Sequence, residues 1–375
     1  MDDDASGLLA YVWGTIVLLV RTAIVVGVLT FAGWIYSRVT LRKCKCTNRL
    51  DGKTVLLTGG STGIGYETVK VLAARGARVI FTCRNTHVGE VALKQIIKET
   101  SNPDVVMKRL DFCSLNSVRQ FADDFLENEN QLNILINNAG RAGPPERSVT
   151  RDGFETTIQS NHLGHFLLTH LLLDLIKKSA PSRIIVVSSM VHSWAKLDVD
   201  DFFVEKRYSP ARVYGVSKLL NIYFARELSD RLRGEGVTVN ALHPGLVRSM
   251  FFRDPPVTFI SKFLRYVVIP MFGKSPLEGA QTTIHLALAP ELEHTSGKYF
   301  VECQEAKPAA HALDPMLQRR AWELTERALG LSLLAPLSAL LTKHLRYVGK
   351  QYLRSPRALF PHSAQGLGEK RTQRS

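Results

Sequence analysis

Tyr214 and Lys218 are the residues whose types and spacing suggest catalysis most directly. They stand four positions apart in Tyr-Gly-Val-Ser-Lys, so a helix would place the phenol and the ammonium on the same face. A nearby cation favours the phenolate, which would let the tyrosine give or take a proton near neutral pH. The same motif also runs from Tyr66 to Lys70. Spacing alone therefore does not identify the catalytic pair.

A glycine-rich turn predicts that a nucleotide binds close to such a pair. Residues 54–57 are a short apolar run typical of a buried strand, and a helical pattern follows the turn. The glycines permit positive φ and a close backbone approach, and the helix N-terminus offers free N–H groups to a pyrophosphate. A structural turn without a ligand is the alternative. The predicted nucleotide contacts in this turn are Gly59, Ser61, Thr62, Gly63, Ile64 and Gly65.

Arg84 bears on which dinucleotide binds. It follows the predicted strand 78–82, where an NAD site usually has an acid for the ribose 2′-hydroxyl. An arginine suits a 2′-phosphate instead, so NADP(H) is the expected cofactor. An arginine on a solvated loop is the competing interpretation.

Further apolar runs cover residues 105–110, 132–136, 183–187 and 237–242. They alternate with helix-length segments, which predicts an α/β fold with a doubly wound parallel sheet of the Rossmann type. Ligands bind beyond the carboxyl ends of the strands in such sheets. Polar or glycine-containing groups stand at these ends, at Asp111, Asn138-Ala139-Gly140, Ser188-Ser189 and Pro244-Gly245.

The N-terminal segment predicts a membrane anchor. Leu8 to Tyr36 is apolar except for Arg21, its start is acidic, and a basic cluster follows it at 38–45. The positive-inside rule then places the downstream domain in the cytosol. Because Arg21 is costly inside a bilayer, one solution is a span of Thr22 to Val39, with Leu8 to Val20 lying along the membrane or tucked back; whether Arg21 lies inside the span stays open. An apolar helix packed on the domain is the alternative.

Composition excludes other classes of function. The net charge of +14 is concentrated beside the first apolar segment and in the last thirty-odd residues, and no basic stripe interleaved with aromatics suggests nucleic-acid binding. The chain's 5 cysteines do not form a disulfide framework. Cys44-x-Cys46 lacks the spacing of a zinc pair, and no histidine cluster accompanies it in the sequence, so no metal site is expected. Palmitoylation of this pair and two plain cysteines both stay open.

Several motifs occur in the order found in the short-chain dehydrogenase/reductases, which the chain resembles over roughly residues 50–330. They are the glycine turn after Thr58, Asn137-Asn-Ala-Gly140, Asn161, Ser189, Tyr214-x-x-x-Lys218 and Pro244-Gly245. Within the superfamily the chain is similar to the membrane-anchored retinol dehydrogenase branch, in stretches such as Asn-His-Leu-Gly-His-Phe and Glu278-Gly-Ala-Gln281. The expected organisation is an anchor at 1–46, this domain at 50–330 and a basic, partly amphipathic tail at 331–375.

The resemblance implies specific roles. Tyr214 would exchange the proton, Lys218 would lower its pKa and hold the nicotinamide ribose, and Ser189 would bind the developing oxyanion, with Ser188 as the alternative. Asn161 would support a relay water. Asp111 and Asn138 would contact the adenine and ribose sides of the cofactor. The other expected cofactor contacts are Ala139, Gly140, Pro244 and Gly245. His87 departs from the branch, which often has a second basic residue there.

The expected function is NADP(H)-dependent interconversion of a lipophilic alcohol and its carbonyl, with retinol and retinal as first choice. A steroid, isoprenoid or lipid-derived carbonyl is an alternative, as is a non-catalytic membrane scaffold. Residues 251–272 are unusually apolar for a loop, which suits a substrate lid or an ordinary packed subdomain. We expect a single-pass protein of the endoplasmic reticulum with a cytosolic catalytic domain. The basic tail would lie on the membrane or pack on the core.

Overall fold

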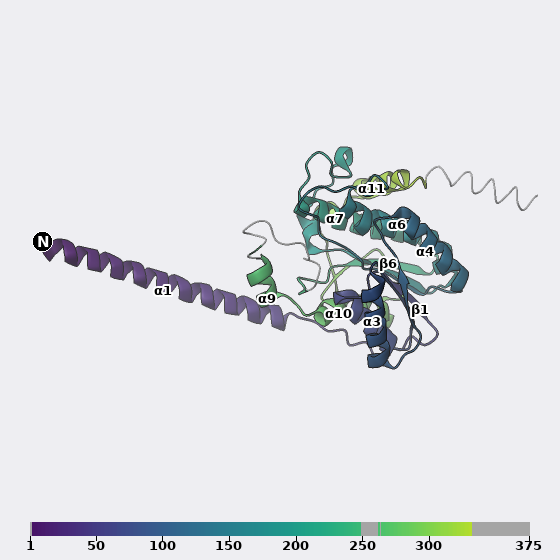
Figure 1. The fold of residues 1–375 in the computed structure, drawn as a ribbon, viewed down its shortest axis with the longest axis horizontal. Helices are drawn as coiled ribbons and strands as arrows, with labels where there is room; N and C mark the ends of the chain where they lie inside the picture. Colours follow the sequence, from purple (N-terminus) through teal and green to yellow (C-terminus); the bar gives the residue numbers. More distant parts are fainter. Residues whose placement is uncertain (1, 249–261, 263, 332–375) are drawn as a thin grey trace, which may run out of the picture. The chain divides into compact units, whose positions relative to one another are not determined.

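The computed structural model of the chain describes residues 2–248, 262 and 264–331, and its centre is an eight-stranded sheet (Figure 1). The strand order is β3-β2-β1-β4-β5-β6-β7-β8, in which β1 to β7 pair in parallel and β8 runs antiparallel to β7. The strands are β1 (Thr54–Leu57), β2 (Arg78–Cys83), β3 (Val105–Arg109), β4 (Ile134–Asn137), β5 (Ser182–Val187), β6 (Val237–Leu242), β7 (Tyr299–Val301) and β8 (Gln304–Ala306). The predicted doubly wound α/β class is confirmed.

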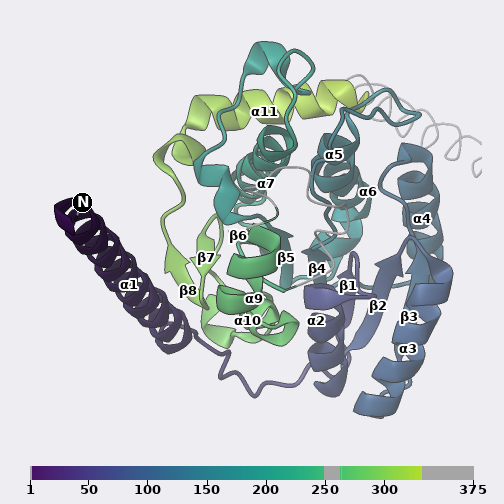
Figure 2. The same ribbon diagram turned by 60° about the vertical axis from the view of Figure 1, so that its left-hand side comes forward.

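Helices cover both faces of this sheet (Figure 2). On one face α2 (Gly63–Ala74) packs between α3 (Thr86–Thr100) and α10 (Pro276–Leu288). The other face carries α4 (Leu115–Asn128), α6 (Gly164–Lys178) and the long α7 (Pro210–Arg231). The remaining helical elements are α1 (Asp2–Val39), α5 (Thr156–Ile158), η1 (Gln159–Leu163), η2 (Met190–Ser193), η3 (Val199–Asp201), η5 (Leu264–Val268), α9 (Ile269–Phe272), η6 (Pro290–Leu292), η7 (Ala310–Leu313) and α11 (Pro315–Ala328).

The strands agree closely with their predicted ranges, because buried parallel strands are near-continuous apolar runs. β4 begins at Ile134 rather than Leu132, since the Leu132 N–H donates to the Ser179 hydroxyl at 2.8 Å and not to a neighbouring strand. The hairpin of β7 and β8 was not predicted. Its strands of 3 residues each are too short for a periodic signal.

α1 corrects the prediction that the anchor breaks at Arg21. The helix runs without interruption from Asp2 to Val39, because a single charged side chain does not stop backbone hydrogen bonding and no proline lies in this segment. Its window Trp13–Ile35 is long and apolar enough, by length and composition, to cross a membrane. That window contains Arg21 and differs from the expected span of Thr22 to Val39.

Two other predictions fall wholly or partly outside the described residues. The basic tail at 332–375 lies outside them, and so do positions 251–261 and 263 of the predicted substrate lid. The described part of the lid forms η5 and α9. The expected domain boundaries stay predictions.

Candidate active site

A cleft of about 1760 Å³ opens beyond the carboxyl ends of the parallel strands. Every predicted site residue except Asn161 lines it, although these residues come from several separate parts of the chain. They are Gly59, Ser61, Thr62, Gly63, Ile64, Gly65, Arg84, Asp111, Asn138, Ala139, Gly140, Ser189, Tyr214, Lys218, Pro244 and Gly245. The alternative serine, Ser188, also borders the cleft.

The glycine turn has the geometry that a dinucleotide needs. Gly59 has a φ of +74°, and a Cβ on Gly65 would lie only 2.1 Å from the Gly59 carbonyl oxygen, so neither position tolerates a side chain. α2 begins at Gly63, and its N-cap, Thr62, makes no side-chain capping bond in the described structure. The N–H groups of the first turn are thus available to a phosphate. The residues present fit a pyrophosphate at this point.

Thr58 and His165 support the turn, and sequence reasoning missed this role. The Thr58 hydroxyl accepts hydrogen bonds from the backbone N–H groups of Asn138 and Ala139, both at 2.9 Å. It also pairs with His165 Nε2 at 2.9 Å. Burial lowers the pKa of His165 to about 3, so this ring is neutral. Thr58 opens the recognised glycine motif and His165 belongs to the Asn-His-Leu-Gly-His-Phe stretch, but neither motif indicates that the two side chains meet.

Asn138 also braces the turn. Its side-chain amide donates to the carbonyl oxygens of Thr58 at 2.8 Å and Gly59 at 3.2 Å. The direct contact with the cofactor that the resemblance implies stays a prediction. Asp111 lies across the cleft, and one of its carboxylate oxygens accepts from the Cys113 N–H at 2.9 Å.

Tyr214 and Ser189 both line the cleft. Burial raises the pKa of the Tyr214 phenol to about 12, and the Ser189 side chain opposes this shift. Ser188 is engaged elsewhere, because its buried hydroxyl donates to the Lys218 carbonyl oxygen at 2.7 Å. Of the two candidate serines, Ser189 is the one that affects the pKa of the phenol.

Lys218 lies buried behind this pair, with its ammonium 5.8 Å from the centre of the Tyr214 ring. It donates to the Val187 carbonyl oxygen at 3.0 Å, and burial lowers its pKa to about 8. Burial sets the direction of both pKa shifts, because desolvation disfavours the phenolate and the ammonium. The expected lowering of the Tyr214 pKa by Lys218 stays a prediction.

Asn161 lies behind the cleft in the π-helical turn η1. Its amide nitrogen donates to the Arg141 carbonyl oxygen at 2.9 Å and the Ser217 hydroxyl at 3.0 Å, and its oxygen accepts from the Arg141 N–H at 2.8 Å. A Cβ on Gly140 would lie 3.3 Å from the Lys218 ammonium and 3.5 Å from the Asn161 oxygen. The Asn161 and Lys218 side chains thus both approach Gly140. Its expected part in a proton relay stays a prediction.

The second Tyr-x-x-x-Lys motif has almost the same internal geometry in a different environment. The Lys70 ammonium lies 5.4 Å from the centre of the Tyr66 ring. However, Lys70 forms ion pairs with Glu67 at 2.9 Å and Glu99 at 3.3 Å, and its hydrogen bond to Glu67 raises its pKa. Neither Tyr66 nor Lys70 lines the cleft. This pair is part of the surface of α2.

Arg84 is exposed at the carboxyl end of β2, on the rim of the cleft. Its neighbour Asn85 caps α3 by accepting from the Val88 N–H at 3.2 Å, and the Cys83 thiol donates to the Ser61 hydroxyl at 3.0 Å. These contacts hold the backbone on both sides of the guanidinium. His87 is exposed and is not among the described residues that line the cleft.

Lys274 supports the Pro244-Gly245 loop and was not singled out from the sequence. It forms an ion pair with Glu302 and donates to the Pro244 carbonyl oxygen at 3.2 Å. Gly245 has a φ of +84°, and a Cβ there would lie 2.8 Å from the Lys274 ammonium. The loop therefore needs glycine at this position.

A cluster outside the cleft corrects one further expectation. No histidine was expected beside Cys44 and Cys46, but His285 of α10 lies there, with Nδ1 3.7 Å from the Cys46 sulfur. The three potential ligand atoms all lie within 4.8 Å of one another. Cys46 and His285 are 239 positions apart in the sequence. A rule based on ligand spacing covers only nearby residues, so it does not detect this histidine.

Comparisons with known proteins agree with this geometry. The family model for short chain dehydrogenase matches residues 53–255. Human retinol dehydrogenase 12 is 46% identical over 288 residues, which is 77% of this chain and 90% of the relative. Mouse retinol dehydrogenase 13 is 45% identical, covering 77% and 87%.

Two solved structures also share the fold. An uncharacterised protein from Mycobacterium paratuberculosis has a TM-score of 0.60 and 31% identity, covering 75% of this chain and 94% of its own. The Pseudomonas aeruginosa RhlG/NADP complex has a TM-score of 0.54 and 28% identity, covering 67% and 95%. The chain is an oxidoreductase that belongs to the short-chain dehydrogenase family, in its retinol dehydrogenase branch.

Proposed function

We propose that the protein is an NADP(H)-dependent oxidoreductase that interconverts a lipophilic alcohol and its aldehyde or ketone, with retinol and retinal as the pair. The observation that carries the proposal is that Ser189, Tyr214 and Lys218 line one cleft together with the glycine turn. When bound, the nicotinamide group supplies or accepts the hydride. This chain's own residues then have to manage the proton and the charge on the substrate oxygen.

Tyr214 acts as proton donor in the direction of reduction. A phenol with a pKa of about 12 is protonated at neutral pH, so it is ready to give its proton to an oxygen that gains negative charge. Ser189 donates a hydrogen bond to the same oxygen, which stabilises the developing oxyanion. Lys218 and Asn161 would support the phenol from behind the cleft, and Lys218 would hold the nicotinamide ribose when the cofactor binds.

Arg84 favours NADP(H) over NAD(H). The strand end that would hold a ribose-binding acid has instead Cys83-Arg84-Asn85, and a guanidinium on the cleft rim suits a 2′-phosphate. The relative RhlG was solved with NADP. The glycine turn, Asp111 and the Asn138–Gly140 and Pro244–Gly245 loops are the proposed contacts to the rest of the cofactor.

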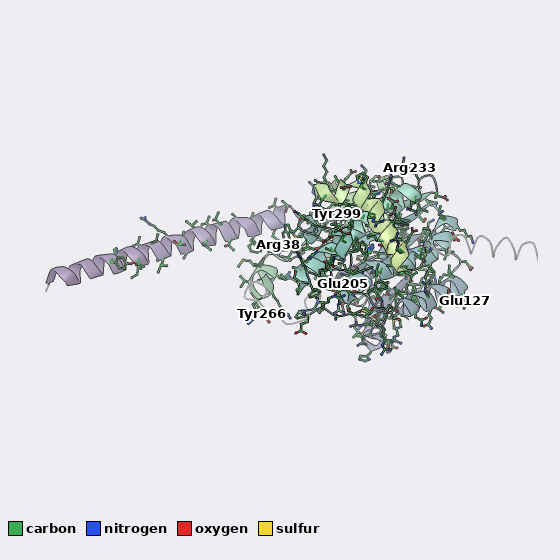
Figure 3. The ribbon with its side chains drawn as sticks, turned by 90° about the horizontal axis from the view of Figure 1, so that it is seen from above. Arg38, Glu127, Glu205, Arg233, Tyr266 and Tyr299 are labelled. Carbon is green, nitrogen blue, oxygen red and sulfur yellow. The ribbon has the colours of Figure 1, made fainter. Side chains whose placement is uncertain are left out.

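Away from the glycine turn, the cleft has apolar lining side chains, among them Val191, Leu197 and Ile269, together with charged ones such as Lys196, Asp198 and Arg207. The apolar side chains suit contact with a hydrocarbon substrate. Next to the cleft, Tyr266 of η5 is 65% exposed and lies at the periphery of the domain (Figure 3). The names of the relatives, retinol dehydrogenases, fit such a substrate.

A membrane location completes the proposal. The window Trp13–Ile35 has 23 residues, which corresponds to about 35 Å of helix and exceeds the roughly 30 Å hydrocarbon core of a bilayer. The basic residues that follow it place the catalytic domain in the cytosol by the positive-inside rule. We propose a single-pass protein of the endoplasmic reticulum, and protease protection in microsomes tests its topology.

The test of activity is NADPH oxidation by the full chain in detergent with retinal, a steroid ketone, an isoprenoid aldehyde and a lipid-derived aldehyde. Wild type should reduce retinal fastest, and Tyr214→Phe should lose at least about 100-fold in rate, the usual contribution of general acid catalysis. Tyr66→Phe is the matched control and should keep full activity. Faster turnover of another carbonyl reassigns the substrate. A wild type that is silent on every carbonyl contradicts the enzyme proposal and favours a scaffold.

Cofactor preference is tested with Arg84→Ala. A hydrogen bond to a charged group contributes roughly 1.5–3 kcal/mol, so the variant should lose about 10- to 150-fold in kcat/KM with NADPH. Its kcat/KM with NADH should stay unchanged. If kcat/KM declines equally with NADPH and with NADH, Arg84 supports the loop and does not bind the 2′-phosphate.

A further inference from the structure

We propose that Cys44, Cys46 and His285 form a binding site for a thiophilic divalent cation, Zn²⁺ in the first instance, which pins the segment after the membrane anchor to α10. The site lies outside the catalytic cleft, since none of the three residues lines it. All three are half-buried, and the two cysteines pack against the core of the domain. Thiolate and imidazole are the ligand types that zinc prefers in proteins.

The distances match such a cation. A tetrahedral zinc with sulfur at 2.3 Å and nitrogen at 2.0–2.1 Å places a sulfur and a nitrogen ligand about 3.6 Å apart, and two sulfurs about 3.8 Å apart. Cys46 Sγ and His285 Nδ1 are 3.7 Å apart. Since all three ligand atoms lie within 4.8 Å of one another, the other two separations have to close by at most about 1 Å. Three protein ligands leave a fourth position for water.

The segment is held in place by its backbone, independently of any ion. The Cys44 N–H donates to the Gln281 side-chain oxygen at 2.9 Å, and Gln281 is four residues before His285 on the same face of α10. On the other side, the Arg75 guanidinium donates to the carbonyl oxygens of Cys46 at 2.9 Å and Thr47 at 2.7 Å. These bonds position both thiols opposite the imidazole. The segment would therefore lose little conformational entropy when a cation binds.

Charges of both signs surround the cluster. Arg183 donates to the Leu286 carbonyl oxygen at 2.9 Å, next to His285, and Arg75 lies beside Cys46, while Glu291 places a negative charge near Cys46 and His285. Two thiolates, a neutral imidazole and a divalent cation sum to zero. α10 packs against α2 and follows Lys274, which holds the Pro244 loop. A bound cation would thus join the anchor segment to a helix that supports the nucleotide site.

Metal binding is tested on the full chain, purified in detergent under reducing conditions, stripped with a chelator and titrated with Zn²⁺ or Co²⁺. Wild type should bind about one zinc per chain and rise in melting temperature, and Co²⁺ should give a thiolate-to-cobalt charge-transfer band. Cys46→Ser and His285→Asn should bind several-fold more weakly, and Cys46→Ser should weaken the band. Cys113→Ser and His294→Asn, outside the cluster, are controls and should bind as wild type does.

Three results would overturn the proposal. They are a wild type that takes up no zinc, a cobalt spectrum without the thiolate band, and cluster variants that bind as tightly as the controls. A Cys44–Cys46 disulfide in the reduced preparation, seen as the loss of two hydrogens in the intact mass, would also overturn it. Because the wild-type titration does not depend on any variant folding, the proposal stays testable if a variant is unstable.

Discussion

Replacing Lys218 with methionine should abolish activity and yet stabilise the nucleotide-free protein. The side chains have similar length, so the buried space stays filled, while the cation that the fold buries is removed. Burial lowers the pKa of Lys218 from 10.5 to about 8. A shift of this size corresponds to about 3 kcal/mol of free energy by which folding disfavours the ammonium at neutral pH.

The lost hydrogen bond reduces this gain only in part. Lys218 donates to the Val187 carbonyl oxygen, but that oxygen also accepts from the Asn221 side chain at 3.3 Å. No buried acceptor is therefore left unpaired, and the expected loss is about 1 kcal/mol. The free energy of unfolding at pH 7 should rise by about 2 kcal/mol in Lys218→Met.

The pH dependence separates this explanation from ordinary packing effects. The folded protein releases the Lys218 proton near pH 8 and the unfolded chain near pH 10.5, so wild type gains stability relative to the variant as pH rises between these values. Urea unfolding of both proteins in detergent, at several pH values from 7 to 10, gives the difference in their free energies of unfolding. A variant that is less stable than wild type at pH 7, or a difference that does not shrink above pH 8, refutes the reasoning.

The remaining predictions concern the serines, the proton and the anchor. Ser189→Ala should lower kcat by about 100- to 1000-fold, as for the loss of an oxyanion donor. Ser188→Ala should mainly lower the melting temperature, because the Ser188 hydroxyl donates to the Lys218 carbonyl oxygen. Equal losses of kcat in the two variants contradict this assignment. With the pKa of Tyr214 at about 12, oxidative kcat/KM should rise about tenfold per unit from pH 6 to 7.5, below the pKa of Lys218, while reductive kcat/KM stays level. An oxidative plateau near pH 7 contradicts it. Arg21→Leu should favour membrane insertion of Trp13–Ile35 by about 2.5–3.5 kcal/mol. Glycosylation mapping measures the inserted fraction, with Thr22→Leu as the control. Equal inserted fractions in the two variants would show that Arg21 lies outside the span.

The sheet was predictable because its signals are local. Thr54–Leu57 and Val237–Leu242 were predicted with the bounds found, since each is an apolar run that ends at a glycine or polar turn. Elements without such a signal were missed, as the β7–β8 hairpin shows. The continuity of α1 was also misjudged, because the energetic cost of Arg21 in a bilayer says nothing about where a helical backbone ends.

The residues around the site were only partly predictable, because their partners are distant in sequence. The link from Thr58 to His165 spans 107 residues, and that from Cys46 to His285 spans 239. No periodicity or motif connects such positions, and only the packing of one element on another brings them together.

The two Tyr-x-x-x-Lys motifs show where this limit lies. The sequence by itself determined that each tyrosine faces its lysine, because helical spacing is a local property, and the two ring-to-ammonium distances are indeed alike at 5.8 and 5.4 Å. Only the tertiary structure decided their environments. It buried Lys218 beside the cleft and left Lys70 of α2 paired with Glu67 and with Glu99 of α3. Burial and neighbouring charge set a group's pKa and its access to a ligand, and both depend on residues far away in the chain.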